Sequence, residues 1–183
     1  DPAGHSRLRF GLERNPVENV AKPQPSEAPG ERYLSEAELA GLWAALGEGR
    51  IDMRHALALK LVVATAGQRV TQVLSARWEH IDFAAALWEA PARLTKTKKP
   101  HVVPLGRTAL ELLRELHGLT GATGTLFPKE GPDARPGATM PADTVSQSLR
   151  RLTNIEAEAA AAEGRAPRWQ PFTPRDLRRT VKT

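Results

Sequence analysis

The sequence predicts a mainly α fold with a small antiparallel β-sheet, that is, an α+β domain. Apolar residues recur at helical spacing on both sides of a short central stretch that is rich in strand-forming residues. The 183 residues are enough for one self-sufficient hydrophobic core and a linker. Hydrophobic residues make up 40% and charged residues 26%, as in globular proteins, so wholesale disorder is excluded.

Residues 1–32 differ from the rest of the chain. They contain five prolines and little periodicity, so we interpret them as a linker that arrives from something upstream and assign the compact domain to residues 33–183. The first residue is not Met, and we therefore expect the chain to be a piece of a longer protein.

The first helices have clear local signals. Ser35 and Glu38 form a capping box, and Leu39, Leu42, Trp43 and Leu46 follow at helical spacing up to Gly47. A second helix over 53–66 is apolar nearly all round, which predicts a central position, and Gly67 ends it. A short helix over 70–76 follows.

The pattern of hydrophobic residues changes from helical to strand-like between residues 77 and 105. Strand-forming residues there are Trp78, Ile81, Phe83, Leu87, Trp88 and the run 101–103. The polar stretch 93–99 lies between the last two strands and carries four cations and no acid, so we expect a basic hairpin tip. Helices resume over 108–117 and 143–163, separated by a long loop rich in Gly and Pro.

The last segment has the pattern of a short helix with a cationic face. Thr173 is a good N-cap and Pro174 suits the first helical position. Cations recur at helical spacing: Arg175, Arg178, Arg179 and Lys182. Arginine forks beside a helix N-terminus suit a phosphate group, although a solvated basic face would give the same pattern.

A second candidate is Arg69, which follows Gly67 between two apolar helices. A charge that emerges from a core-forming region must be paired or functional. An arginine at a helix start that bonds a loop carbonyl is the structural alternative.

Composition excludes several classes of function. The chain has no cysteine, and its five histidines have no paired spacing, so we expect no disulfide, no cysteine nucleophile and no metal site. Its longest apolar stretch is too short to span a bilayer, so we expect no membrane association. The formal charge of +5 favours a polyanionic partner.

Three ordered segments resemble the tyrosine recombinases of the phage integrase family. Residues 66–74 with 78–82 resemble the first arginine box, 95–105 the β-hairpin lysine region, and 173–180 the second arginine box. The resemblance implies site-specific cleavage and rejoining of double-stranded DNA through a 3′-phosphotyrosyl intermediate. It also implies that the linker 1–32 comes from an upstream DNA-binding domain. The further implications are no cofactor, tetramers on paired DNA sites, and a cytoplasmic, bacterial or phage-encoded protein.

The resemblance also implies residue roles. Arg69 and Arg178 would stabilise the pentavalent phosphate, and Lys96 on the hairpin would protonate the leaving oxygen. Lys98 and Lys99 are alternatives for that proton donor and are otherwise phosphate contacts. We further expect DNA or phosphate contacts from His101, Arg150, Arg151 and Arg179, for each of which ordinary surface solvation is the alternative.

Three departures from the family pattern bear on activity. Arg175 stands where the second box usually has histidine, so this catalytic position stays charged and is a poor proton shuttle. Gln72 replaces the usual acid three positions after Arg69. We expect the nucleophile beyond Thr183, because Tyr33 is the one tyrosine and precedes every box. We expect the fragment to be inactive alone; the alternatives are a non-catalytic DNA-binding relative, accessory or repressor, and a basic module that binds no nucleic acid.

Overall fold

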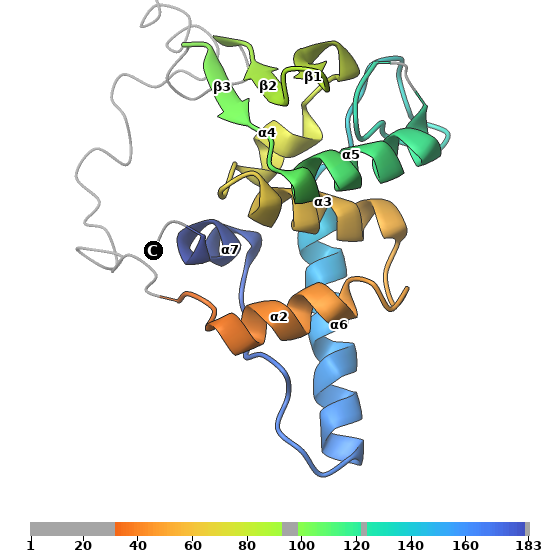
Figure 1. Cartoon of the computed structure of the whole chain (residues 1–183). Coiled ribbons are helices and arrows are strands. Elements are labelled where there is room, and N and C mark those ends of the chain that lie inside the picture. Colours follow the sequence, from red (N-terminus) through yellow and green to blue (C-terminus); the bar gives the residue numbers. More distant parts are fainter. Residues whose placement is uncertain (1–31, 93–98, 122–123, 182–183) are drawn as a thin grey trace, which may run out of the picture. The chain divides into compact units, whose positions relative to one another are not determined.

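A computed structural model describes residues 32–92, 99–121 and 124–181 of the chain (Figure 1). The helices are α2 (Glu36–Ala45), α3 (Met53–Ala64), α4 (Val70–Leu74), α5 (Arg107–Thr120), α6 (Ala142–Ala162) and α7 (Pro174–Thr180). A 3₁₀ turn, η1 (Trp78–His80), leads into the strands β1 (Ile81–Asp82), β2 (Leu87–Ala90) and β3 (His101–Pro104). The predicted mainly α fold with a small antiparallel sheet is confirmed.

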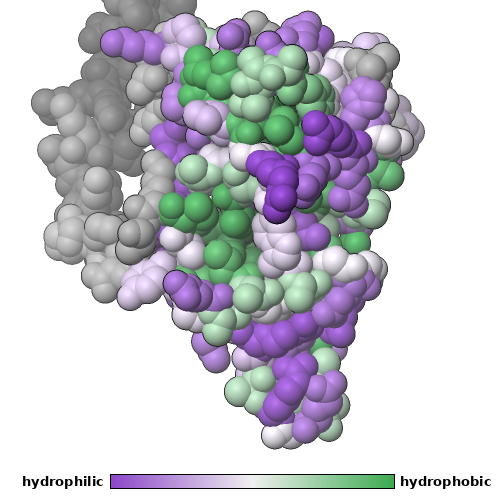
Figure 2. Space-filling model, viewed as in Figure 1, coloured by the Kyte–Doolittle hydropathy of each residue, from purple (hydrophilic) through white to green (hydrophobic). Residues whose placement is uncertain are grey.

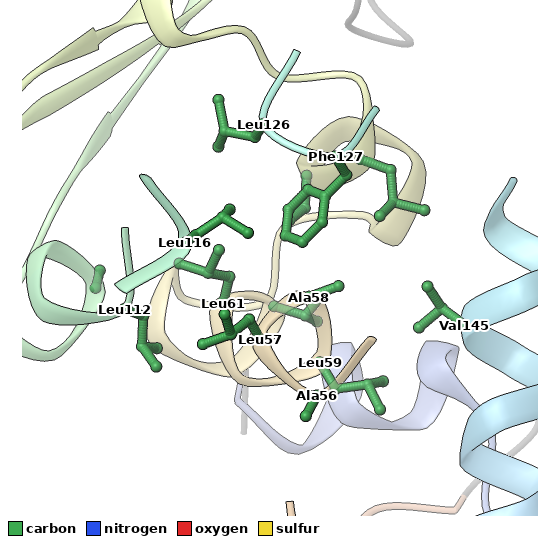
Figure 3. Packing of buried hydrophobic residues seen from close by; sticks show 14 of the residues in the cluster. Ala56, Leu57, Ala58, Leu59, Leu61, Leu112, Leu116, Leu126, Phe127 and Val145 are labelled. Carbon is green, nitrogen blue, oxygen red and sulfur yellow. The ribbon is translucent and has the colours of Figure 1, made fainter. Parts of the chain in front are cut away.

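Helix α3 is the central element, as its all-round apolar sequence predicts. Ala58, Leu59 and Val62 have no exposed surface, and α3 packs against α4, α5, α6 and α7. Figure 3 shows α3 side chains meeting those of α5 on one side and Val145 of α6 on another. Each buried leucine contributes about 1.5 to 3 kcal/mol, so α3 anchors the elements around it.

The sheet is three-stranded in the order β1-β2-β3, and both pairs are antiparallel. Trp88 lies opposite Val103, and both are buried on the face that joins the hydrophobic core. Side chains alternate along a strand, so His101, which lies opposite Ala90, shares that face. The predicted basic hairpin tip lies outside the described residues.

Trp78 and Phe83 are exceptions to the strand prediction, because Trp78 belongs to the turn η1 and Phe83 lies in the turn between β1 and β2. Trp78 is held by contacts distant in the sequence. Its backbone N–H donates to Gly124 O (3.0 Å), and its ring stacks with Phe83 and meets His117 edge-on. These tertiary contacts outweigh the strand propensity of tryptophan.

The segment before α2 is fixed to α7 and to the loop that precedes it. The capping box of Ser35 and Glu38 is present, as predicted. Glu38 also accepts hydrogen bonds from Arg32 and from the backbone N–H of Gln170 (3.0 Å), and these bonds, led by that of Arg32, lower the pKa of Glu38 to about 2. The N–H of Leu34 donates to Thr180 Oγ1 (2.9 Å) on α7.

Hydrophilic and hydrophobic residues are mixed on the face of the molecule that Figure 2 shows. Figure 2 shows hydrophilic residues interspersed with weakly hydrophobic ones over the C-terminal half of α6, at the bottom of the view. None of the helices within the described ranges is long and apolar enough to cross a membrane.

Candidate phosphate-binding site

Arg69 is presented by a tight turn between α3 and α4. Ala66 and Gly67 both have left-handed backbone conformations, with φ of 53° and 71°, and together they reverse the chain after α3. The Gly67 N–H donates back to Val62 O (2.9 Å). Arg69 then starts α4: its N–H donates to Gln72 Oε1 (3.3 Å), while its side chain is exposed. The turn therefore holds the Arg69 backbone and leaves its guanidinium in solvent.

Helix α7 is fixed by its own cap and by one buried residue. The backbone N–H and the hydroxyl of Thr173 donate to Asp176 Oδ2 (2.9 and 2.7 Å). Burial opposes the charge of Asp176, but the bonds from Thr173 and Arg179 prevail and lower its pKa. Leu177 has no exposed surface and belongs to the core that α3 anchors. The next residue, Arg178, is thereby held beside the turn after α3.

The two predicted arginine boxes meet at Gly67. Arg178 Nη1 donates to Gly67 O (2.8 Å), across 111 positions of the sequence. Burial of its guanidinium, and then repulsion by Arg69, lower the pKa of Arg178. The two charges are thus close enough to repel each other. Two neighbouring guanidinium groups favour an anion between them, and planar forks suit phosphate oxygens.

His101 lies at the edge of the same turn. Its Nε2 is 3.5 Å from Nε2 of Gln68, the residue between Gly67 and Arg69. The imidazole is exposed, at the start of β3. Sequence reasoning placed His101 on a strand near phosphate, but it did not predict the contact with Gln68 or the role of the Gly67 carbonyl. The first arginine box contains both Gly67 and Gln68, but the partners of these two residues depend on long-range packing.

The other predicted cations have varied surroundings. Arg179 Nη1 donates to Asp176 Oδ1 (2.6 Å), whereas Arg175 is exposed on the first turn of α7. Arg150 and Arg151 are exposed on α6, and Arg150 lines a pocket of about 250 Å³ with Phe172 and Thr173. Lys99 is exposed just before β3, and Lys96 and Lys98 lie outside the described residues.

The described ranges contain no cluster of three or more His, Cys, Asp or Glu side chains that could hold a metal ion.

The close approach at Gly67 gives a testable prediction. A Cβ there would lie 3.0 Å from the backbone oxygen of Arg178, in a left-handed conformation that costs other residues about 1 to 2 kcal/mol. We expect Gly67→Ala to lower the free energy of unfolding by about 2 to 3 kcal/mol and to displace Arg178. Urea denaturation measures the first effect and phosphate binding the second.

Gly49 is the matched control. It has the same φ of 71°, but a Cβ there would meet nothing within 4 Å. We therefore expect Gly49→Ala to cost only the conformational term of about 1 to 2 kcal/mol. Equal losses in the two variants would contradict the proposed contact between the turn and α7.

The fold is that of a tyrosine recombinase catalytic core. The catalytic core of lambda integrase matches with a TM-score of 0.54 at 21% identity, over 81% of this chain and 80% of that one. A variant of the Tn1549 transposon integrase, in complex with transposon right-end DNA, matches with a TM-score of 0.63 at 13% identity, over 98% of this chain and 61% of that one. At these identities the likeness shows the fold alone.

The chain belongs to the phage integrase family, whose family model matches residues 32–183. It is 29% identical over 141 residues to the prophage integrase IntZ of Escherichia coli K12, covering 76% of this chain and 33% of the relative. It is 32% identical over 116 residues to the integrase of Enterobacteria phage P4, covering 57% of this chain and 25% of the relative. The chain thus spans a third or less of the length of these relatives.

Proposed function

We propose that this chain is the phosphate-binding part of the catalytic domain of a site-specific DNA recombinase, an integrase. The observation that carries the proposal is the meeting of Arg69 and Arg178 at Gly67. The partner of this chain is double-stranded DNA, and the site binds one phosphodiester of the DNA backbone. We also propose, from family membership, that four copies assemble on paired DNA sites in the cytoplasm of a bacterial cell.

The proposed reaction uses the two arginines as electrostatic catalysts. A tyrosine hydroxyl oxygen forms a bond to phosphorus, the bond to the 5′-oxygen breaks, and a 3′-phosphotyrosyl link and a free 5′-hydroxyl result. Negative charge grows on the two nonbridging oxygens during this step. Fixed guanidinium groups stabilise the transition state, which carries this charge, more than they stabilise the ground state. They therefore lower the activation barrier of the cleavage step.

Tyr33 is a poor candidate for the nucleophile. The next residue, Leu34, bonds Thr180 on α7, whereas Arg178 bonds the turn after α3. Residues two apart on a helix project about 200° from each other, so the chain next to Tyr33 contacts α7 on the side opposite to Arg178. The Tyr33 side chain is 59% exposed.

A non-catalytic DNA-binding relative is the second candidate. Gln72 offers an amide where the family pattern has an acid, and it bonds the Arg69 backbone. Arg175 keeps its charge where that pattern has histidine. A covalent protein–DNA adduct on a nicked substrate separates the two functions, because only the enzyme forms one; the test needs the whole protein, since Tyr33 is the one tyrosine of this chain.

Salt dependence tests DNA binding by this chain. Among the described residues, we expect phosphate contacts from six cations: Arg69, Lys99, Arg150, Arg151, Arg175 and Arg178. Contacts from about six cations predict a slope near −5 when log affinity is plotted against log salt. Fluorescence anisotropy with a labelled duplex, from about 50 to 200 mM KCl, measures it. A shallow slope, or no binding, would instead indicate a basic module that contacts protein.

A further inference from the structure

We propose that the pocket between α6 and the segment that leads into α7 holds one unpaired nucleotide of the DNA strand that is cleaved. The inference rests on the proposed function and deepens it, because it adds a site for a base beside the site for the phosphodiester. It depends on the place of the pocket on α7, on the chemistry of its walls, and on the DNA end that the proposed reaction produces.

The pocket lies one helical turn from Arg178. It reaches α7 at Pro174, the first residue of that helix. Pro174 and Arg178 are four residues apart, so they share one side of α7 and are separated by about 6 Å along its axis. Successive nucleotides are about 3.4 Å apart along a duplex strand. A nucleotide one or two positions from the phosphodiester at Arg178 can therefore reach the pocket.

The pocket is large enough for a nucleobase. Its volume is about 250 Å³, whereas a cavity of about 150 Å³ already holds a benzene ring. The chain leaves the lower end of α6 in Figure 1 and returns upward to α7. One wall of the pocket is accordingly a side of α6 with Arg150 and Asn154, and the other is the returning segment with Phe172.

Hydrogen bonds hold both walls in place. The indole N–H of Trp169, on the returning segment, donates to Thr153 Oγ1 on α6 (3.2 Å), and both residues are buried. Thr173 is fixed by its bond to Asp176 (2.9 Å). Because the walls are already ordered, a ligand that enters the pocket loses little affinity to the ordering of side chains and loops.

The side chains of the walls suit a nucleotide. The half-buried ring of Phe172 offers a surface on which a base can stack. Asn154 and Arg150 are exposed, and neither side chain has a hydrogen-bond partner among the residues that the structure describes. An asparagine amide pairs with the edge of adenine, and a guanidinium binds a phosphate. No acidic residue lines the pocket, so an anionic ligand meets no repulsion from its walls.

The proposed reaction needs a place for such a nucleotide. Cleavage leaves a strand with a free 5′-hydroxyl, and this end must separate from its complement before it attacks another strand. The separated base loses its pairing and its stacking. Phe172 and Asn154 replace a stacking neighbour and part of the pairing, so the pocket favours the separated end and holds it beside the arginine pair.

A nicked duplex with one unpaired adenine at the 5′ side of the nick tests the proposal with this chain itself. Stacking of one base on an aromatic side chain changes affinity by about 5- to 150-fold. We therefore expect this duplex to bind at least about fivefold more tightly than the same nicked duplex with the adenine paired. Fluorescence anisotropy measures both affinities.

Two variants assign this preference to the pocket. Phe172→Leu keeps an apolar side chain at the edge of the core and removes the aromatic ring, so the preference should fall below about threefold. Asn154→Ala removes only an exposed amide and should reduce the preference by about 2- to 10-fold. Both variants should bind the paired duplex within about twofold of the unsubstituted chain, which also shows that they are folded.

Gln147→Ala is the matched control. Gln147 is likewise an exposed amide on α6, but it does not line the pocket, and its replacement should leave the preference unchanged. Equal affinity of the unsubstituted chain for the two duplexes, or a preference that survives both pocket variants, overturns the proposal. Tighter binding of free deoxyadenosine monophosphate than of the unpaired strand would identify a free-nucleotide site and also overturns it. Failure to bind either duplex contradicts the proposed function, and with it the inference.

Discussion

Replacing Arg178 with alanine will weaken the binding of duplex DNA by about 30- to 150-fold, because charge-assisted bonds from a guanidinium contribute about 2 to 3 kcal/mol. One of its N–H groups holds the Gly67 carbonyl, which leaves the rest of the fork for a phosphate. Burial and Arg69 lower the pKa of Arg178, so a bound anion relieves a repulsion that already exists. Fluorescence anisotropy at fixed salt measures the change.

Two further variants make the result specific. Arg178→Lys keeps the charge and loses the planar fork, so its affinity should fall between those of the unsubstituted chain and the alanine variant. Arg151→Ala removes an exposed cation from α6 and should cost only about threefold, the usual worth of a solvated charge. If Arg151→Ala weakens binding as much as Arg178→Ala, DNA binds along a diffuse basic surface and the arginine pair is not its site.

The helices were predictable because their signals are local. Ser35 with Glu38 and Thr173 with Asp176 cap their helices through contacts three residues apart, and such contacts can be recognised in sequence alone. The all-round apolar pattern of α3 likewise predicts its burial. Trp78 could not be assigned this way, because a contact with Gly124, far along the chain, decides its conformation.

The site was predictable in its residue types and not in its geometry. The two boxes identify Arg69 and Arg178 by resemblance, but their meeting at Gly67 requires α3 and α7 to pack together. The partner of His101 depends on the register between β2 and β3, which sequence reasoning did not assign. For Arg179, however, an acid at the i−3 position, Asp176, is visible in the sequence as an ion-pair partner.

Glu156 on α6 holds the segment that leads into α7. The side chain is 1% exposed, and it accepts hydrogen bonds from Arg165 Nη1 (2.7 Å), the Arg168 backbone N–H (3.0 Å) and Arg168 Nε (2.9 Å). Burial would raise its pKa, but the bonds from Arg168 and Arg165 prevail and lower the pKa of Glu156 to about 2. Arg168 also bonds Glu48, beyond the end of α2. One carboxylate therefore joins α6, α2 and the approach to α7.

We expect Glu156→Gln to lower the free energy of unfolding at pH 7 by about 3 kcal/mol, because a neutral amide replaces a buried carboxylate and weakens its charge-assisted hydrogen bonds from Arg165 and Arg168. The folded pKa lies below the unfolded value, so the stabilisation is present above about pH 4.5 and is lost as the pH falls toward 2. Urea denaturation of both proteins across this range should show their stabilities converging at acid pH.

Glu163→Gln is the control, because Glu163 bonds the same Arg165 from a 60% exposed side chain and should change stability by less than about 0.5 kcal/mol. A constant difference between Glu156→Gln and the unsubstituted chain from pH 7 to pH 3 would contradict the argument, because a packing defect persists when the carboxylate is protonated and a lost charge does not.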